Sequence, residues 1–150
     1  MAHLRKFCGR VPMVDYSALG THDKFLCGIV LSVSWRDYFA PISSFKTPQR
    51  TNIKDSWGRP ISSIRFSFMI PVPQGVLSVK RIANEPNKPY RTLLNMELRY
   101  CRRQKDSICS KANFAYHAAT VKKDELIVRN CCDFKALESA SAEYAEQRLT

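Results

Sequence analysis

Residues 91–103 read Arg-Thr-Leu-Leu-Asn-Met-Glu-Leu-Arg-Tyr-Cys-Arg-Arg, and this stretch decides the predicted fold. Counting every second residue places one set of side chains on one face, namely Thr92, Leu94, Met96, Leu98 and Tyr100. The opposite face receives most of the charged side chains, in the set Arg91, Leu93, Asn95, Glu97, Arg99, Cys101 and Arg103. A period of two over this length predicts a β-strand with one buried face.

Other segments carry similar signals. Strands are predicted where residues alternate or where apolar, β-branched and aromatic side chains gather, in residues 25–35, 64–70, 76–82, 112–118 and 126–131. Residues 40–60 hold prolines and a glycine among Ser, Thr and Asn, which indicates a loop. Short turns between consecutive strands favour antiparallel pairing. We therefore expect a mainly β fold (antiparallel sheet, sandwich or partly open barrel) with a short C-terminal α-helix, and an α+β fold as the alternative.

The chain reads as a single domain over residues 1–150, because this length suits one core better than two. Residues 1–24 form a weakly patterned basic N-terminal arm, and residues 25–132 form the β-rich body. Residues 133–150 change to helical chemistry, with Asp133 as the expected N-cap and apolar residues at intervals of three to five.

Positive charge is the outstanding feature of the composition. The chain has 24 Lys and Arg against 13 Asp and Glu, a formal net charge of +11. The predicted C-terminal helix is locally acidic, so the excess belongs to the arm and the body. A compact domain with this excess favours an anionic partner, because bound anions relieve the self-repulsion of the cations. The candidate partners are nucleic acid or a ribonucleoprotein, with an anionic membrane surface as a further alternative.

The candidate polyanion-binding residues are Lys and Arg side chains grouped near the ends of predicted strands and in the arm. Clustered cations bind phosphates by displacing counterions, without reading a base sequence. The candidates are Arg99, Arg102, Arg103, Lys105, Lys111, Lys80, Arg81, Lys122, Lys123, Arg5, Lys6 and Arg10.

Catalytic signatures are missing from the sequence. No Gly-x-Ser-x-Gly, phosphate-cradling Gly-rich loop or His-Glu-x-x-His occurs, and the three histidines are far apart in the chain. Six cysteines are present without any Cys-x-x-Cys pair, so they are expected to be reduced, buried side chains rather than a zinc site. We therefore expect a protein that is not an enzyme, with no catalytic residues, no metal and no cofactor.

In size, charge and the order of basic arm, β body and short tail, the chain resembles the small matrix and coat proteins of some RNA viruses. That resemblance implies a structural protein that self-associates into homo-oligomers and contacts a genome or nucleocapsid. The alternative is an RNA-binding accessory factor, ribosome-associated or like a silencing suppressor, and a Cys/His enzyme ranks third. With no signal peptide or membrane span, we expect a cytoplasmic protein, with the nucleus or the virion as alternatives.

Overall fold

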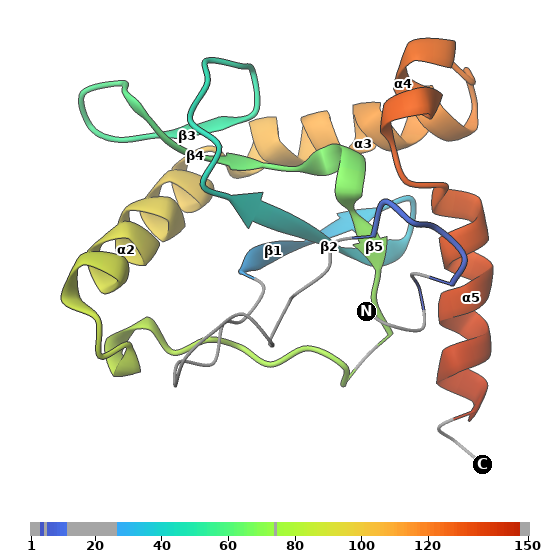
Figure 1. Cartoon of the computed structure of the whole chain (residues 1–150), viewed down its shortest axis with the longest axis horizontal. Helices are drawn as coiled ribbons and strands as arrows, with labels where there is room; N and C mark the ends of the chain where they lie inside the picture. The colour runs from blue at the N-terminus through green and yellow to red at the C-terminus, as the bar shows by residue number, and fades with distance from the viewer. Residues whose placement is uncertain (1–3, 5, 12–26, 74, 148–150) are drawn as a thin grey trace.

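The computed structural model describes residues 4, 6–11, 27–73 and 75–147 (Figure 1). Strands β1 (Gly28–Val33) and β2 (Arg36–Ser43) form an antiparallel hairpin, in which Val33 pairs with Arg36. At the other end of the hairpin, a Cβ on Gly28 would collide with the carbonyl oxygen of Ala40 and the ring of Phe39. Glycine at this position therefore lets the two strands approach closely.

The rest of the sheet is built around β2. Strands β3 (Asn52–Lys54) and β4 (Pro60–Ile64) form a second hairpin, and β4 pairs with the end of β2, giving the order β1-β2-β4-β3. The short strand β5 (Ile70–Pro71) pairs with β2 beyond that path. All of these pairs are antiparallel, and the sheet curls into a half-barrel.

Most of the second half of the chain is helical. The α-helices are α2 (Lys88–Arg103), α3 (Lys105–Thr120), α4 (Glu125–Asn130) and α5 (Phe134–Gln147). Two short 3₁₀ helices, η1 (Phe66–Phe68) and η2 (Ile82–Asn84), lie in the connections that precede them. In Figure 1, α2 and α5 flank the sheet on opposite sides, and α3 runs between their ends and packs on β1.

The mainly β prediction is therefore wrong, and the α+β alternative is confirmed. Residues 91–103 belong to α2 because Asn87 caps that helix, accepting a hydrogen bond from Tyr90 N at 2.9 Å, and Pro89 stands in its first turn. The side chains that face the protein recur at helical spacing, with Leu94 and Glu97 buried and Cys101 half-buried. The predicted strands at 112–118 and 126–131 are likewise helical, within α3 and α4.

Two other predicted strands are also corrected. Within residues 64–70, Ile64 ends β4, η1 follows, and Ile70 begins β5, so the alternating apolar side chains do not form one strand. Residues 76–81 have no regular structure and lead into η2. Strand β1 lies within the predicted strand 25–35, and β2 follows it. Residues 25 and 26 lie outside the described residues. The predicted C-terminal helix is confirmed as α5, where the Asp133 side chain accepts from Ala136 N at 3.0 Å.

The core joins the sheet to α3 and α5 through a polar contact inside an aromatic cluster. The rings of Tyr38 on β2, Tyr116 on α3 and Phe134 on α5 lie with centroids 5.7 to 6.0 Å apart. Both tyrosine hydroxyls donate to Glu138 Oε1 at 2.8 Å, and Lys135 Nζ donates to Glu138 Oε2 at 3.0 Å. This network fixes α5 against the sheet. Among the described residues, none of the helices has the length and apolar character needed to cross a membrane.

Candidate functional site

The loop that follows β2 is held in place by the hydroxyl of Ser63. Ser63 Oγ donates to the carbonyl oxygen of Phe45 at 2.7 Å and accepts from Gln49 Nε2 at 3.0 Å and Asn52 Nδ2 at 2.8 Å. Ser63 is fully buried on β4 and pairs in register with Ser43 at the end of β2. A saturated buried network of this kind fixes the backbone of residues 43–49 in one arrangement.

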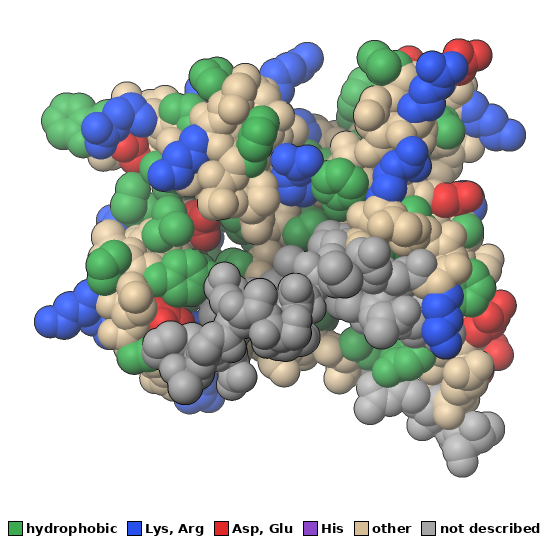
Figure 2. All heavy atoms as spheres, in the orientation of Figure 1, with side chains coloured by type: hydrophobic (Ala, Val, Ile, Leu, Met, Phe, Trp, Pro, Cys, Tyr) green, Lys and Arg blue, Asp and Glu red, His purple; other side chains and the backbone are tan. Residues whose placement is uncertain are grey.

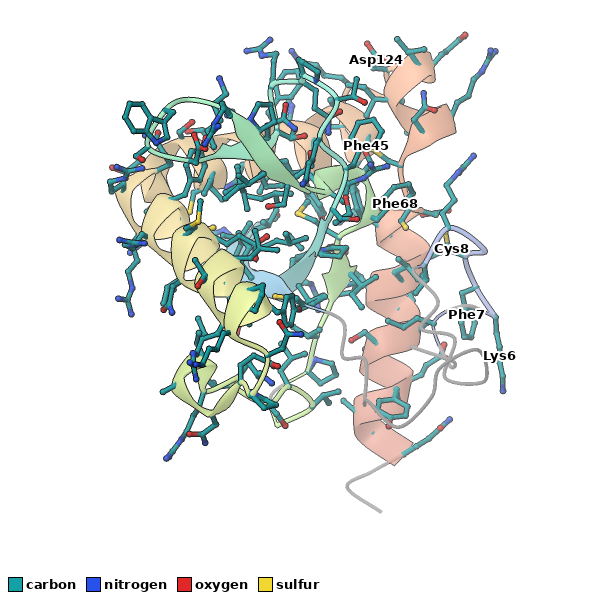
Figure 3. The ribbon with its side chains drawn as sticks, turned by 60° about the vertical axis from the view of Figure 1, so that its left-hand side comes forward. Lys6, Phe7, Cys8, Phe45, Phe68 and Asp124 are labelled. Carbon is teal, nitrogen blue, oxygen red and sulfur yellow. The ribbon has the colours of Figure 1, made fainter. Side chains whose placement is uncertain are left out.

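Arg65 lies between two aromatic rings beside this loop. Its guanidinium carbon is 5.5 Å from the centroid of Phe45 and 5.0 Å from that of Phe68. Its backbone N–H donates to the carbonyl oxygen of Pro41 at 2.8 Å, which holds the residue against β2. Figure 3 shows Phe45 and Phe68 one above the other at this edge of the sheet. Stacking on aromatic rings orients a guanidinium without neutralising it, so the positive charge remains available to an anion.

Hydroxyl groups and a second cation complete the cluster. Ser43 Oγ is buried and has no hydrogen-bond partner among the described residues. Ser44 and Lys46 follow on the exposed part of the loop. A buried hydroxyl without a partner costs free energy, so its presence indicates a site that a ligand completes. We define Ser43, Ser44, Lys46 and Arg65 as the loop cluster, whose hydroxyls and cations suit a phosphodiester.

Further cations and an exposed ring surround the loop cluster. Lys111 on α3 donates to the backbone carbonyl oxygen of Arg50 at 2.9 Å, which places the Lys111 ammonium against the chain that follows the loop. In the β3–β4 turn, Asp55 accepts from the backbone N–H groups of Arg59 and Trp57 at 2.9 Å and from Arg59 Nε at 2.8 Å. These hydrogen bonds, that of the Arg59 backbone above all, lower the pKa of Asp55. The resulting turn presents Trp57 with 82% of its surface exposed. Figure 2 shows Lys and Arg side chains spread over this upper edge of the molecule.

The predicted polyanion-binding residues occupy several separate places. Arg99, Arg102, Arg103 and Lys105 are exposed around Gln104, where α2 meets α3, and Lys111 is on α3 beside the loop. The remaining residues lie apart from this group. Lys80 and Arg81 precede η2, Lys122 and Lys123 lie between α3 and α4, Lys6 and Arg10 lie in the N-terminal segment, and Arg5 lies outside the described residues. The candidates on α2 and α3 do not lie at strand ends as predicted, because the chain is helical there.

The sequence analysis missed the loop cluster. Ser43, Ser44 and Lys46 lie in a segment that the sequence analysis interprets only as a loop, and Arg65 lies in the predicted strand 64–70. A Ser-Ser-x-Lys sequence is too common to be singled out by itself. The loop cluster could be recognised only from the pairing of Ser43 with Ser63, and no local sequence pattern specifies that pairing.

The cysteines and histidines offer no competing site in the described part of the chain. All six cysteines are free thiols, and burial raises the pKa of Cys131 and Cys132. His117 is exposed on α3, whereas His3 and His22 lie outside the described residues. Across residues 4, 6–11, 27–73 and 75–147, no group of three His, Cys, Asp or Glu side chains is arranged to hold a metal ion.

Comparison with known families defines the class of this protein. The family model described as "Toxin ToxN, type III toxin-antitoxin system" matches residues 1–142. The chain therefore belongs to the ToxN family of toxins.

Two curated relatives are similar over nearly the whole chain. Endoribonuclease ToxN of Pectobacterium atrosepticum is 27% identical over 157 residues, which covers 97% of this chain and 88% of that protein. Endoribonuclease AbiQ of Lactococcus lactis subsp. lactis is 26% identical over 162 residues, covering 98% and 85%.

Solved structures share the fold. A type III toxin structure that concerns selective toxin inhibition by a non-coding RNA pseudoknot superposes with a TM-score of 0.82 at 24% identity, over 97% of this chain and 92% of that chain. The structure of AbiQ, a lactococcal anti-phage endoribonuclease, superposes with a TM-score of 0.77 at 24% identity, over 97% and 92%. These two comparisons establish that the α+β half-barrel is a recurring architecture.

The family overturns three predictions. The chain is not a structural protein of the viral matrix or coat class, because the matching family consists of toxins and both curated relatives are endoribonucleases. The alternative of a ribosome-associated or silencing-suppressor-like accessory factor does not fit this family either. The prediction of a protein without enzymatic activity is wrong for the same reason. Sequence motifs failed here because the loop cluster contains neither a histidine nor a carboxylate to mark it.

Proposed function

We propose that this protein is an endoribonuclease toxin that cleaves RNA at the loop cluster. The observation that carries the proposal is the buried, unpartnered Ser43 hydroxyl beside two cations on a loop pinned by Ser63. The family and the endoribonuclease names of the relatives support the same activity. The similarity to these relatives covers nearly the whole chain, so the proposal is not limited to one part of it.

The RNA itself supplies the nucleophile in this proposal. RNA differs from DNA by its 2′-hydroxyl, which is the group that can distinguish the two substrates. The 2′-oxygen attacks the neighbouring phosphorus, the P–O5′ bond breaks, the 2′ proton passes to water, and the departing 5′-oxygen takes a proton from water. The products carry a 2′,3′-cyclic phosphate and a 5′-hydroxyl, so atoms and charge balance.

The side chains of the loop cluster stabilise the charge that develops on the phosphate. Lys46 and Arg65 provide positive charge, and Arg65 is held ready by its two aromatic neighbours. The Ser43 and Ser44 hydroxyls donate to phosphate oxygens. Because the loop backbone is fixed before RNA binds, little reorganisation is needed during the reaction.

The test is cleavage of a defined RNA by the purified full chain. Lys46→Gln and Ser44→Ala should each lower kcat about 10²- to 10³-fold, as expected for losing one preorganised charge-stabilising donor. Lys54→Gln, a matched change on β3 outside the loop cluster, should retain activity. A substrate with a single 2′-deoxy nucleotide at the cut should resist cleavage. Normal activity of Lys46→Gln, or cleavage of the 2′-deoxy substrate, would disprove this assignment.

We further propose that a non-coding RNA binds and restrains the toxin. A structural neighbour is associated with selective inhibition by a non-coding RNA pseudoknot, and another with a processed non-coding RNA that regulates an antiviral system. The net charge of +11 supports contact with RNA phosphates in this protein. Affinity should fall steeply with salt, and affinity that is flat between 50 and 200 mM salt would count against the proposal. A membrane partner has no support, and self-association stays a prediction to be checked by light scattering. We also propose a cytoplasmic location, because a toxin that cleaves RNA must reach cellular RNA.

A further inference from the structure

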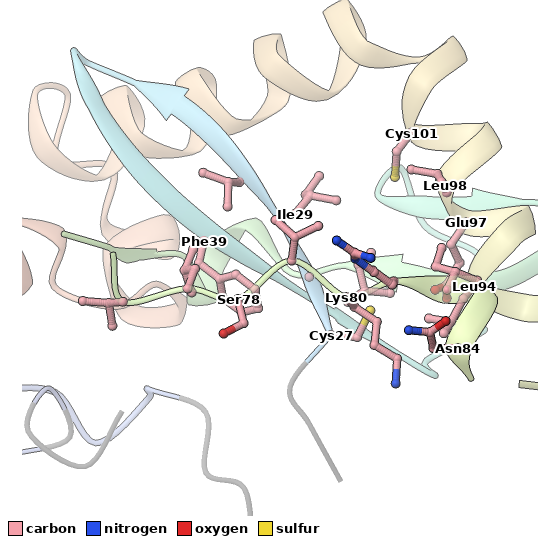
Figure 4. Close-up of a pocket in the computed structure, with 18 of the residues that line it drawn as sticks. Cys27, Ile29, Phe39, Ser78, Lys80, Asn84, Leu94, Glu97, Leu98 and Cys101 are labelled. Carbon is pink, nitrogen blue, oxygen red and sulfur yellow. The ribbon is translucent and has the colours of Figure 1, made fainter. Parts of the chain in front are cut away.

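A cavity of about 980 Å³ opens between the sheet and α2. Ile29 on β1 and Phe39 on β2 form one wall, and Leu94 and Glu97 on α2 form the opposite wall. Figure 4 shows these two walls facing each other, with Lys80 between them. The volume lies at the upper end of the range for small-molecule sites, which is 300 to 1,000 Å³.

This cavity is separate from the loop cluster. Ile42 lines the cavity, whereas Ser43, the next residue on β2, belongs to the loop cluster. Ser44, Lys46 and Arg65 are likewise not among the residues that line the cavity. A ligand in the cavity therefore does not touch the groups proposed to cleave RNA, although both sites depend on the same strand.

The wall formed by α2 contains a buried carboxyl. Glu97 is only 5% exposed, and it lines the cavity together with Leu94. Burial raises the pKa of Glu97, and the nearby Ser62 hydroxyl acts in the opposite direction. The Glu97 charge also raises the pKa of Cys27 and of Cys101 to about 11, after burial as the larger cause. These three side chains therefore converge on the cavity.

Burying a carboxyl in an apolar wall is unfavourable for folding. Transfer of a carboxylate from water to such a wall destabilises the folded state unless hydrogen bonds compensate for it, and a leucine at this position would fill the same space at lower cost. The Ser62 hydroxyl is one neighbour of the Glu97 carboxyl. The position of Glu97 is explained if a ligand supplies further hydrogen-bond donors.

The mouth of the cavity is cationic. Lys80 and Arg81 both line the pocket, and Lys80 Nζ pairs with Glu85 Oε2 at 2.9 Å. Arg81 is exposed at the same edge. A ligand for this site thus has an apolar, flat body, hydrogen-bond donors at one end and an anionic group at the other, which is the description of a nucleotide.

We propose that the cavity takes one guanine base of a bound RNA chain. On its Watson–Crick edge, guanine places two neighbouring donors, N1–H and N2–H, which match the two oxygens of one carboxylate. Adenine and cytosine pair one donor with one acceptor there, and uracil flanks its single donor with two carbonyl oxygens. Ile29, Phe39 and Leu94 enclose the ring, and Arg81 contacts the adjoining phosphate. That the guanine belongs to an RNA chain, and not to a free nucleotide, rests on the proposed function.

The first test is an NMR titration of the full-length protein with the four 5′-mononucleotides, followed by a short guanine-containing RNA. GMP and the RNA should shift the amide signals of residues 27–30 and 94–101, whereas AMP, CMP and UMP should not. Inosine in place of guanine lacks the N2 donor and should bind about tenfold more weakly. Stronger binding of AMP than of GMP would overturn the base assignment. If GMP shifts these signals but the guanine-containing RNA does not, the cavity does not bind a base of an RNA chain.

The second test separates binding from folding. Glu97→Gln keeps the side-chain volume but replaces one acceptor with a donor, so guanine affinity should fall at least about tenfold. Its Tm should be unchanged or higher, because a buried charge is removed. Glu143→Gln on the exposed face of α5 is the matched control and should bind guanine normally. A lower Tm with unchanged guanine binding would assign Glu97 a structural role and refute the proposal.

The two proposals can fail separately. If the protein cleaves RNA while no nucleotide shifts the cavity signals, the endoribonuclease proposal stands and the guanine pocket is wrong. If the cavity binds guanine in RNA while the protein cleaves no RNA, the pocket stands and the proposed activity is wrong.

Discussion

Replacing Glu138 with alanine should destabilise the fold by about 2–4 kcal/mol. The carboxyl is buried, with 7% of the residue exposed, and accepts from Tyr38 and Tyr116 at 2.8 Å each. Tyr38 is fully buried, so its hydroxyl would lose its only partner in the described structure, at a cost of about 1–3 kcal/mol. Tyr116 would still accept from Lys135 at 2.7 Å, which limits the second loss to about 1 kcal/mol.

Urea denaturation followed by far-UV circular dichroism measures this loss. A fall in the midpoint at constant slope is expected, because the change affects stability and not the surface exposed on unfolding. The double variant Tyr38→Phe, Glu138→Ala is the decisive comparison. It removes the orphaned hydroxyl together with its partner, so it should lose less stability than the sum of the two single variants. Additive losses would refute the argument that the buried hydroxyl carries the penalty.

The same carboxyl predicts how stability depends on pH. Burial by itself would raise the pKa of Glu138, but hydrogen bonds from Tyr38, Tyr116 and Lys135 together outweigh burial and lower it. A carboxyl whose pKa is lower in the folded state stabilises the protein above its unfolded pKa of about 4.3. That contribution is lost as the pH falls through the lower folded value. Glu138→Ala should therefore lose less stability than the wild type on acidification below about pH 4, and parallel curves would contradict the assignment.

The remaining predictions concern the surface and the first hairpin. Glutamate at Arg102, Arg103 and Lys105 together should weaken RNA binding and flatten its salt dependence, with stability changed by about 0.5 kcal/mol or less per site; unfolding would mean that these exposed residues are structural. Ser34 and Trp35 form a two-residue turn with φ of 48° and 66°, a conformation that favours Asn-Gly, so Ser34→Asn with Trp35→Gly should stabilise the fold by about 1–2 kcal/mol in urea denaturation. Unchanged or lower stability would show that the exposed Trp35 ring contributes more than the turn costs.

A comparison of strand β1 with helix α2 explains which parts of the fold can be predicted from the sequence. The segment Gly28–Val33 contains Ile, Val and Val, whose β-branched side chains restrict it to a strand, and it is one. Residues 91–103 alternate equally well, but Thr92 is their only β-branched residue, and Leu, Met, Glu and Arg all favour helix. Leu94, Glu97 and Cys101 also fit a helical period, so alternation alone could not decide. The cap at Asn87 and the proline at 89 held the missing information.

The candidate site was less predictable than the fold for a physical reason. Net charge is a sum over residues and does not depend on the fold. An anionic partner could therefore be inferred from the composition alone. Cleavage chemistry depends on which side chains meet, and Ser43 meets Ser63 only through the register of two strands that are far apart in the chain. A shift of one residue would exchange the faces of β4 and place Ser62 against the loop instead.

The same register assigns opposite roles to neighbouring residues, which links the two proposed sites. On β4, Ser63 fixes the loop after β2, whereas the adjacent Ser62 faces Glu97 on the other side of the sheet. On β2, Ile42 lines the cavity and Ser43 belongs to the loop cluster. The sheet thus separates a rigid, hydroxyl-rich face suited to a phosphodiester from an apolar face suited to a base. An RNA chain that passes over the end of β2 could reach both faces, so base recognition and cleavage would be joined by one strand end without sharing a side chain.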